Sequence, residues 1–131
     1  MNIMKKLLAM LLVILVLTAC GQNKDNKQEA GYMNITAQQA KEIMDTQGGY
    51  IILDTRTREE YDEKHIPGAI LIPHDQIKQE AESVLKDKDQ LILVYCRSGR
   101  RSKLASEDLV ALGYTNIKEF GGIIDWPYAV E

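Results

Sequence analysis

The sequence predicts an α/β fold with a mostly parallel central sheet and helices on both faces. Short apolar runs suited to strands alternate along the chain with amphipathic segments suited to helices. The predicted strands are residues 50–54, 69–72, 90–95 and 115–120. The run "QLILVY" at 90–95 is almost continuously apolar, which is typical of a strand buried on both faces of a sheet. A chain of 131 residues is long enough to bury one such core.

Two of the predicted helices begin with a recognisable cap. Residues 36–46 start at Thr36 and carry Gln39 three positions later, which is the pattern of a capping box. The same T-x-x-E spacing at Thr57 predicts a short helix over 57–63. These caps place one helix before the strand at 50–54 and another directly after it.

Two further helices are predicted from apolar residues at helical spacing. One covers residues 74–85, and the other covers 102–113 and ends at Gly113. The second helix is expected to turn Leu104, Ala105, Leu109 and Leu112 inward. With the strands, these helices complete a doubly covered sheet, in which sites form beyond the carboxyl ends of the strands. Asp54 and Cys96 both lie at such ends.

The N-terminus has the pattern of an export signal. Lys5 and Lys6 precede an apolar segment, residues 7–19, that is too short for a typical membrane span. The segment ends in "LTAC", which resembles the lipobox of bacterial lipoproteins and implies lipidation at Cys20. A plain secretory signal and an uncleaved anchor are the alternatives.

This pattern divides the chain into three parts. Residues 1–19 are the expected signal peptide, 20–34 the lipidated N-terminus with a polar tether, and 35–131 the folded domain. The protein is therefore expected on the extracytoplasmic face of the cell membrane, held by its lipid, at the cell surface or in the periplasm.

Charge and cysteine content limit the possible partners. The net charge of -3 gives no general reason to expect nucleic-acid binding. Lipidation of Cys20 would leave Cys96 without a disulfide partner. One cysteine with His65 and His74 gives no recognisable zinc spacing, so we expect neither a metal nor another cofactor.

The stretch "YCRSGRRS", residues 95–102, crowds three cations around one thiol. Gly99 allows a positive φ, so the backbone N–H groups of residues 97–101 can turn inward above a helix N-terminus. Donors and cations favour the thiolate of Cys96 at neutral pH, and they also hold a small anion beside it. In the alternative interpretation, Cys96 is a core residue and the arginines are solvated.

Three stretches resemble the single-domain rhodanese sulfurtransferases over about residues 35–129. They are "YDEKHIPGAILI" at 61–72, "YCRSGRRS" at 95–102 and "FGGIIDW" at 120–126. The resemblance implies a persulfide on Cys96, which receives sulfur from an anionic donor such as thiosulfate and passes it to cyanide or a thiol. It implies that the substrate is bound by the loop residues Arg97, Ser98, Gly99, Arg100 and Arg101, with Arg97 and Arg101 as the main donor-binding groups. The implied supporting residues are Asp54, Arg56 and His65, with the histidine in a structural role.

Related folds include phosphatases, arsenate reductases and non-catalytic modules that carry or bind sulfur. The phosphatase relatives use a longer Cys-x5-Arg loop, whereas Arg101 gives Cys-x4-Arg here. A smaller ring of N–H groups suits a sulfur atom better than a tetrahedral phosphoryl group. Loop length therefore favours sulfur transfer, and the other classes remain as alternatives.

Overall fold

A computed structural model describes residues 28–29 and 31–131, and in this part of the chain six strands form one sheet. Five strands run parallel, and the two-residue strand β1 pairs antiparallel at one edge. The order across the sheet is β1 (Gln28–Glu29), β2 (Tyr32–Asn34), β6 (Ile117–Gly122), β5 (Leu91–Cys96), β3 (Tyr50–Asp54) and β4 (Ile70–Leu71).

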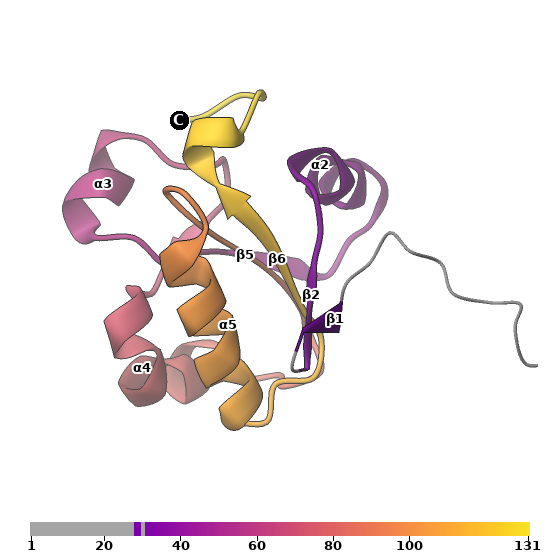
Figure 1. The fold of residues 1–131 in the computed structure, drawn as a ribbon, viewed down its shortest axis with the longest axis vertical. Coiled ribbons are helices and arrows are strands. Elements are labelled where there is room, and N and C mark those ends of the chain that lie inside the picture. The colour runs from indigo at the N-terminus through magenta and orange to yellow at the C-terminus, as the bar shows by residue number, and fades with distance from the viewer. Residues whose placement is uncertain (1–27, 30) are drawn as a thin grey trace, which may run out of the picture.

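Helices cover both faces of this sheet (Figure 1). Helices α4 (Ile77–Val84) and α5 (Arg100–Ala111) pack on one face, and α2 (Ala37–Thr46) lies on the other. Helix α3 (Arg58–Glu63) follows β3 near the end of the sheet where β5 stops. The predicted fold class, a mostly parallel sheet with helices on both faces, is confirmed.

Both predicted capping boxes are present. The Thr36 hydroxyl accepts the Gln39 N–H at 3.1 Å, and the Gln39 side chain accepts the Thr36 N–H at 2.9 Å. Thr57 caps α3 in the same way with Glu60. Each box satisfies two backbone donors that would otherwise be unpaired at the start of the helix.

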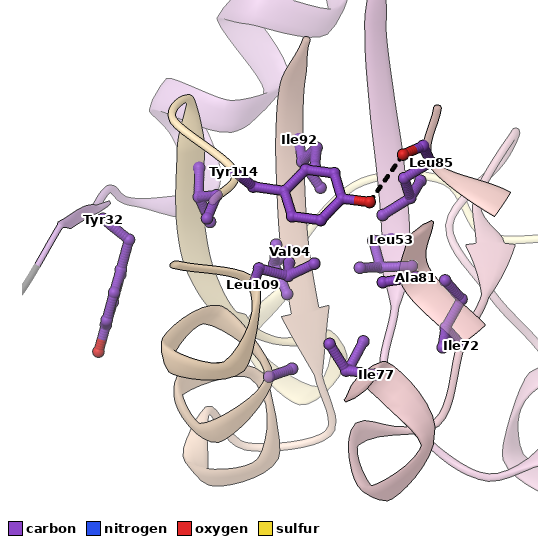
Figure 2. Close-up of a cluster of buried hydrophobic side chains, with 12 residues drawn as sticks. Tyr32, Leu53, Ile72, Ile77, Ala81, Leu85, Ile92, Val94, Leu109 and Tyr114 are labelled. Carbon is purple, nitrogen blue, oxygen red and sulfur yellow. Dashed lines mark hydrogen bonds between the residues drawn. The ribbon is translucent and has the colours of Figure 1, made fainter. Parts of the chain in front are cut away.

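Successive residues of the central strands enter two separate cores, because side chains alternate across a sheet. Ile92 and Val94 of β5 face α4 and α5, in the cluster of Figure 2. In that cluster the Tyr114 hydroxyl donates to the Leu85 carbonyl at 2.7 Å. Leu93 and Tyr95 face the second cluster, which includes Ala40 and Ile43 of α2. This alternation places Cys96 on the α5 face of the sheet.

Two helices differ from their predicted bounds. Residues 74–76 of the predicted helix 74–85 form a separate 3₁₀ turn, η2 (His74–Gln76), ahead of α4. The last helix begins at Arg100 rather than at residue 102.

The prediction that Leu104 faces inward is wrong, since this side chain is 41% exposed. The buried stripe of α5 follows Ser102, Ala105, Ser106 and Leu109 at helical spacing. A pattern built from apolar residues alone missed this stripe because half of it is serine. Ser106 is satisfied by donating to the Ser102 carbonyl at 2.8 Å.

The sheet also begins earlier than predicted. Strand β2 lies inside the segment assigned to the tether, and it pairs with β6 through Met33 opposite Lys118 and Asn34 opposite Glu119. The residues immediately before 35 therefore belong with the sheet. Three residues give too short an apolar pattern to identify a strand from sequence.

The predicted signal peptide and Cys20 lie outside the described residues. Within residues 28–29 and 31–131, no helix is long and apolar enough to cross a membrane.

Candidate active site

Cys96 is the last residue of β5, and only residues 97–99 separate it from α5. Gly99 is the N-cap of α5 and has φ 109°, so the predicted positive φ is confirmed. Strand β6 runs alongside, with Gly122 opposite Cys96 after an irregularity in the strand pairing. The thiol is thus set at a strand end, beside the N-terminus of a twelve-residue helix.

Two donors approach the sulfur of Cys96, which is 1% exposed. The Gly99 N–H lies 3.0 Å from Sγ, and the Ser102 hydroxyl lies 3.3 Å from it. Hydrogen bonds donated to sulfur favour the anionic form. Among the described residues, Gly99 is the one member of 97–101 whose N–H bonds to Sγ. One of the five predicted N–H groups therefore contacts the cysteine sulfur, and the role of the other four toward a bound sulfur stays a prediction.

Arg101 is paired with Glu60 of α3. Its two terminal nitrogens lie 2.6 and 2.9 Å from the two carboxylate oxygens, a two-pronged ion pair. This pairing raises the pKa of Arg101, and the charge of an ionised Cys96 raises it further. Arg101 therefore contributes charge near the thiol while its guanidinium is held by Glu60.

The same ion pair has a defined pH range. Hydrogen bonds from Arg101 lower the pKa of Glu60 from 4.5 to about 2. A carboxylate with a lowered pKa in the folded state stabilises the fold above its unfolded pKa, and that stabilisation is lost as the pH falls through the folded value. The Glu60–Arg101 pair is therefore intact at neutral pH and breaks between about pH 4.5 and 2.

The other two arginines of the loop are exposed. Arg100 is solvent-exposed in the first turn of α5, whereas Arg97 lines a cavity of about 400 Å³. Arg56 and Lys64 add positive charge to this cavity and Glu60 and Glu63 add negative charge, while Ile123 and Ile124 give it an apolar side. Of the two arginines predicted to bind the donor, the structure places Arg97 against this open volume. Donor binding by either arginine stays a prediction.

A second polar network lies on the opposite face of the sheet. Asp54 and Tyr95 are opposite each other on β3 and β5, and the Tyr95 hydroxyl donates to Asp54 at 2.6 Å. The buried Arg56 guanidinium binds both Asp54 oxygens and also donates to the Lys64 carbonyl at 2.7 Å. Tyr95 accepts the Ile66 N–H at 3.1 Å. Asp54 and Arg56 thus tie β3 and β5 to the segment leading to β4.

Burial and pairing oppose each other in this network. Burial disfavours the charged form of Arg56, but hydrogen bonding and charge attraction to Asp54, with smaller contributions from Tyr95 and Glu60, together outweigh it, and the pKa of Arg56 is raised. Burial, together with the hydrogen bond to Asp54, raises the pKa of Tyr95 as well. Arg56 remains a cation and Tyr95 a neutral donor, so Asp54 is held by one charge and one hydroxyl.

His65 lies outside the hydrogen bonds that reach Cys96. Its ring stacks on Tyr61 with centroids 3.9 Å apart, and its Nδ1 lies 2.9 Å from the Tyr61 carbonyl oxygen. Its backbone exchanges two hydrogen bonds with Glu131, at 2.8 and 2.9 Å. These contacts attach the C-terminal residue to the turn before β4.

Sequence reasoning missed two residues beside the thiol, Ser102 and Glu119. Glu119 is 2% exposed on β6, and its Oε1 lies 2.7 Å from the Ser102 hydroxyl and 2.8 Å from the Gly121 N–H. A signal existed for Glu119. It lies two residues after the buried Ile117 in the same strand, so both side chains point to the same face of the sheet, toward the core. The only signal for Ser102 was its helical spacing from Ala105 and Leu109.

Comparison with known proteins agrees with this geometry. The Rhodanese-like domain family matches residues 36–127. The thiosulfate sulfurtransferase PspE of Escherichia coli is 38% identical over 73 residues, which cover 56% of this chain and 70% of PspE. The putative sulfur carrier protein YrkF of Bacillus subtilis is 30% identical over 107 residues, 81% of this chain and 57% of YrkF.

A solved structure, a rhodanese with anions from E. coli, has a TM-score of 0.59 and 34% identity; the match covers 63% of this chain and 96% of that one. The family match spans every strand of the parallel sheet but β2 and includes the whole loop around Cys96. The chain therefore belongs to the rhodanese-like domain family.

Proposed function

We propose that the protein is a sulfurtransferase that moves a sulfane sulfur from an anionic donor such as thiosulfate to a thiol or cyanide. The observation that carries the proposal is the position of Cys96, buried at a strand end with Gly99 N–H and Ser102 hydroxyl at 3.0 and 3.3 Å from its sulfur. A thiol so placed is suited to covalent catalysis through its thiolate.

The reaction has two steps. The Cys96 thiolate attacks the outer sulfur of thiosulfate, the S–S bond of thiosulfate breaks, and sulfite leaves with the electron pair. The resulting Cys96 persulfide is then attacked at its outer sulfur by the acceptor, which leaves with that sulfur and restores the thiolate. The Gly99 N–H is placed to stabilise the negative charge on the cysteine sulfur in both steps.

Loop length favours a sulfur donor over a phosphate ester, whereas the charges near the loop suit a small anion of either kind. Four residues separate Cys96 from Arg101, so the loop is one residue shorter than the Cys-x5-Arg loop of phosphatases. Arg97, Arg56 and Lys64 line the cavity beside this loop together with Glu60 and Glu63, so cations outnumber carboxylates there and the balance favours a small anion. The phosphatase and arsenate reductase alternatives are disfavoured by the loop length.

A sulfur carrier is the second candidate, supported by the similarity to a protein named as a putative sulfur carrier. A carrier would take up one sulfur on Cys96 and deliver it to a protein partner without turning over small acceptors. Repeated thiocyanate formation from thiosulfate and cyanide separates the enzyme from the carrier.

Loading of sulfur onto Cys96 is the direct test. Intact-protein mass spectrometry after thiosulfate treatment is expected to show one added sulfur atom, which cyanide removes. Cys96→Ser should not load, because an un-ionised hydroxyl is a poor nucleophile for sulfur. If the wild-type protein gains no sulfur from thiosulfate, polysulfide or a persulfide donor, the sulfurtransferase and carrier proposals both fail.

We also propose that the protein is anchored to the membrane through a lipid on Cys20, on the extracytoplasmic face. The support is the lipobox-like "LTAC" after a short apolar segment. Cys20→Ala is expected to move the protein from the membrane to the soluble extracytoplasmic fraction, or to stop its processing, as seen by fractionation and immunoblotting. A Cys20→Ala protein that is processed and stays membrane-bound like the wild type contradicts the anchor.

A further inference from the structure

Glu119 is a buried acid that no ion pair reaches among the described residues. Its neighbours in register are Asn34 on β2 and Val94 on β5, neither of which carries charge. A buried carboxylate without a cation depends on hydrogen-bond donors for its stabilisation.

The charged groups near Glu119 and Cys96 are already engaged or exposed. On α5, Arg101 is held by Glu60 and Arg100 is exposed. Arg97 in the loop is exposed as well. On β5 the neighbouring titratable group is Cys96 itself. A negative charge on Glu119 is therefore stabilised only by hydrogen bonds among the described residues, from the Ser102 hydroxyl at 2.7 Å and the Gly121 N–H at 2.8 Å, and it faces Cys96 without a cation between them.

The Ser102 hydroxyl connects the two groups. Its oxygen lies 2.7 Å from Glu119 Oε1 and 3.3 Å from Cys96 Sγ. The carbonyl oxygens of Gly99 and Gly121 lie 3.0 and 3.4 Å from the same hydroxyl, but they are neutral and compete weakly with a charged acceptor. A hydroxyl has one proton to donate and can accept others.

The hydrogen bonds from Cys96 through Ser102 to Glu119 can be satisfied by two arrangements of protons. In one, the Cys96 thiol donates to Ser102 and Ser102 donates to the Glu119 carboxylate. In the other, neutral Glu119 donates to Ser102 and Ser102 donates to the Cys96 thiolate. Each state carries one negative charge and has one proton in each link. With both groups ionised, one link would lack a proton.

We propose that Cys96 and Glu119 share a single negative charge through the Ser102 hydroxyl, so that Glu119 holds the proton when Cys96 is the thiolate. In the exchange the S–H bond breaks as an O–H bond forms on Ser102, while the original Ser102 O–H bond breaks as one forms on Glu119. No electron is transferred. Glu119 is a positioning residue, because it acts on sulfur only through Ser102. The inference rests on the proposed function and deepens it. It says that Glu119 and Ser102 control how much of Cys96 is the thiolate that sulfur transfer requires.

The coupling predicts a two-step titration of Cys96 reactivity. The sulfur and the carboxylate oxygen are at most ~6 Å apart, because each lies within hydrogen-bond distance of the same oxygen. At this separation the two negative charges repel each other, so placing a second charge on the pair requires a higher pH than placing the first. The two steps belong to the pair and not to either residue.

The test is the pH dependence of alkylation of Cys96 by iodoacetamide in the full-length protein, measured by mass spectrometry of the peptide that carries Cys96. The wild-type rate should rise in two steps. Glu119→Gln keeps the size of the side chain but removes its charge, so its rate should rise in one step and reach its full value at lower pH. Glu107→Gln removes an exposed carboxylate from α5 and should keep the two-step profile of the wild type.

Single-step profiles at the same pH in wild type and Glu119→Gln overturn the proposal. If Glu119→Gln does not fold, infrared spectroscopy of the wild type tests whether Glu119 holds the proton. A neutral carboxylic-acid band should be present near pH 7 and be lost when Cys96 is alkylated, because Glu119 then takes the remaining charge. A wild-type spectrum without that band also overturns the proposal. Alkylation needs no sulfur donor, so a two-step profile without sulfur loading refutes only the sulfurtransferase function.

Discussion

Gly122→Ala is expected to abolish sulfur loading of Cys96 while most of the sheet remains folded. An added Cβ at this position would lie 1.9 Å from the Arg97 carbonyl oxygen and 2.5 Å from the Ser98 nitrogen. Both are backbone atoms of the active-site loop, so the loop must move away from β6. The Gly99 N–H would then lose its position 3.0 Å from the sulfur. Loss of one such donor in comparable sites costs about 10²–10³ in rate.

The cause of this effect is steric contact and not backbone strain. Gly122 has φ -132°, an extended conformation that any residue adopts. Overpacking of this kind costs about 1–3 kcal/mol of folding stability, which denaturant unfolding can measure beside the loading rate. Gly48→Ala serves as the control, because an added Cβ there meets nothing within 4 Å. A Gly122→Ala protein that loads sulfur at the wild-type rate contradicts this account of the loop.

The fold could be predicted largely because its signals are local. Alternating apolar runs and amphipathic segments identified the strands and helices of the parallel sheet apart from β2, and two capping boxes located the starts of α2 and α3. The position of Cys96 at the end of a buried strand, followed by Gly99, likewise predicted a tight turn into a helix. Each of these inferences uses residues only a few positions apart.

The contacts around the thiol depend on pairings between distant residues and could not be predicted in the same way. Arg101 meets Glu60 across 41 positions, and Glu119 meets Ser102 across 17. Glu60 was recognisable only as the end of a capping box, although it also holds Arg101. A loop rich in arginine predicts a positive site, but which arginine remains open to a ligand depends on which carboxylates fold against it.

Asp54→Ala is expected to cost about 3–5 kcal/mol of unfolding free energy, because it leaves a buried cation without its partner. Arg56 is 3% exposed and donates to both Asp54 oxygens, and Tyr95 donates to one of them. The alanine variant would keep the Arg56 guanidinium in the interior with only the Lys64 carbonyl as acceptor. A loss of this size is a large share of the stability of a small domain, so Asp54→Ala should unfold at much lower denaturant concentration than the wild type.

A second Asp–Arg pair in the same domain provides the matched control. Asp62 and Arg58 on α3 lie 3.6 Å apart with side chains 62% and 66% exposed. Water screens this pair, so Asp62→Ala should change the unfolding free energy by no more than about 0.5 kcal/mol. Tyr95→Phe removes one hydrogen bond to Asp54 but keeps the ion pair, and its cost should fall between the two aspartate variants. Equal losses in Asp54→Ala and Asp62→Ala would show that burial of the Asp54–Arg56 pair does not stabilise the carboxyl ends of β3 and β5, where the active-site loop begins.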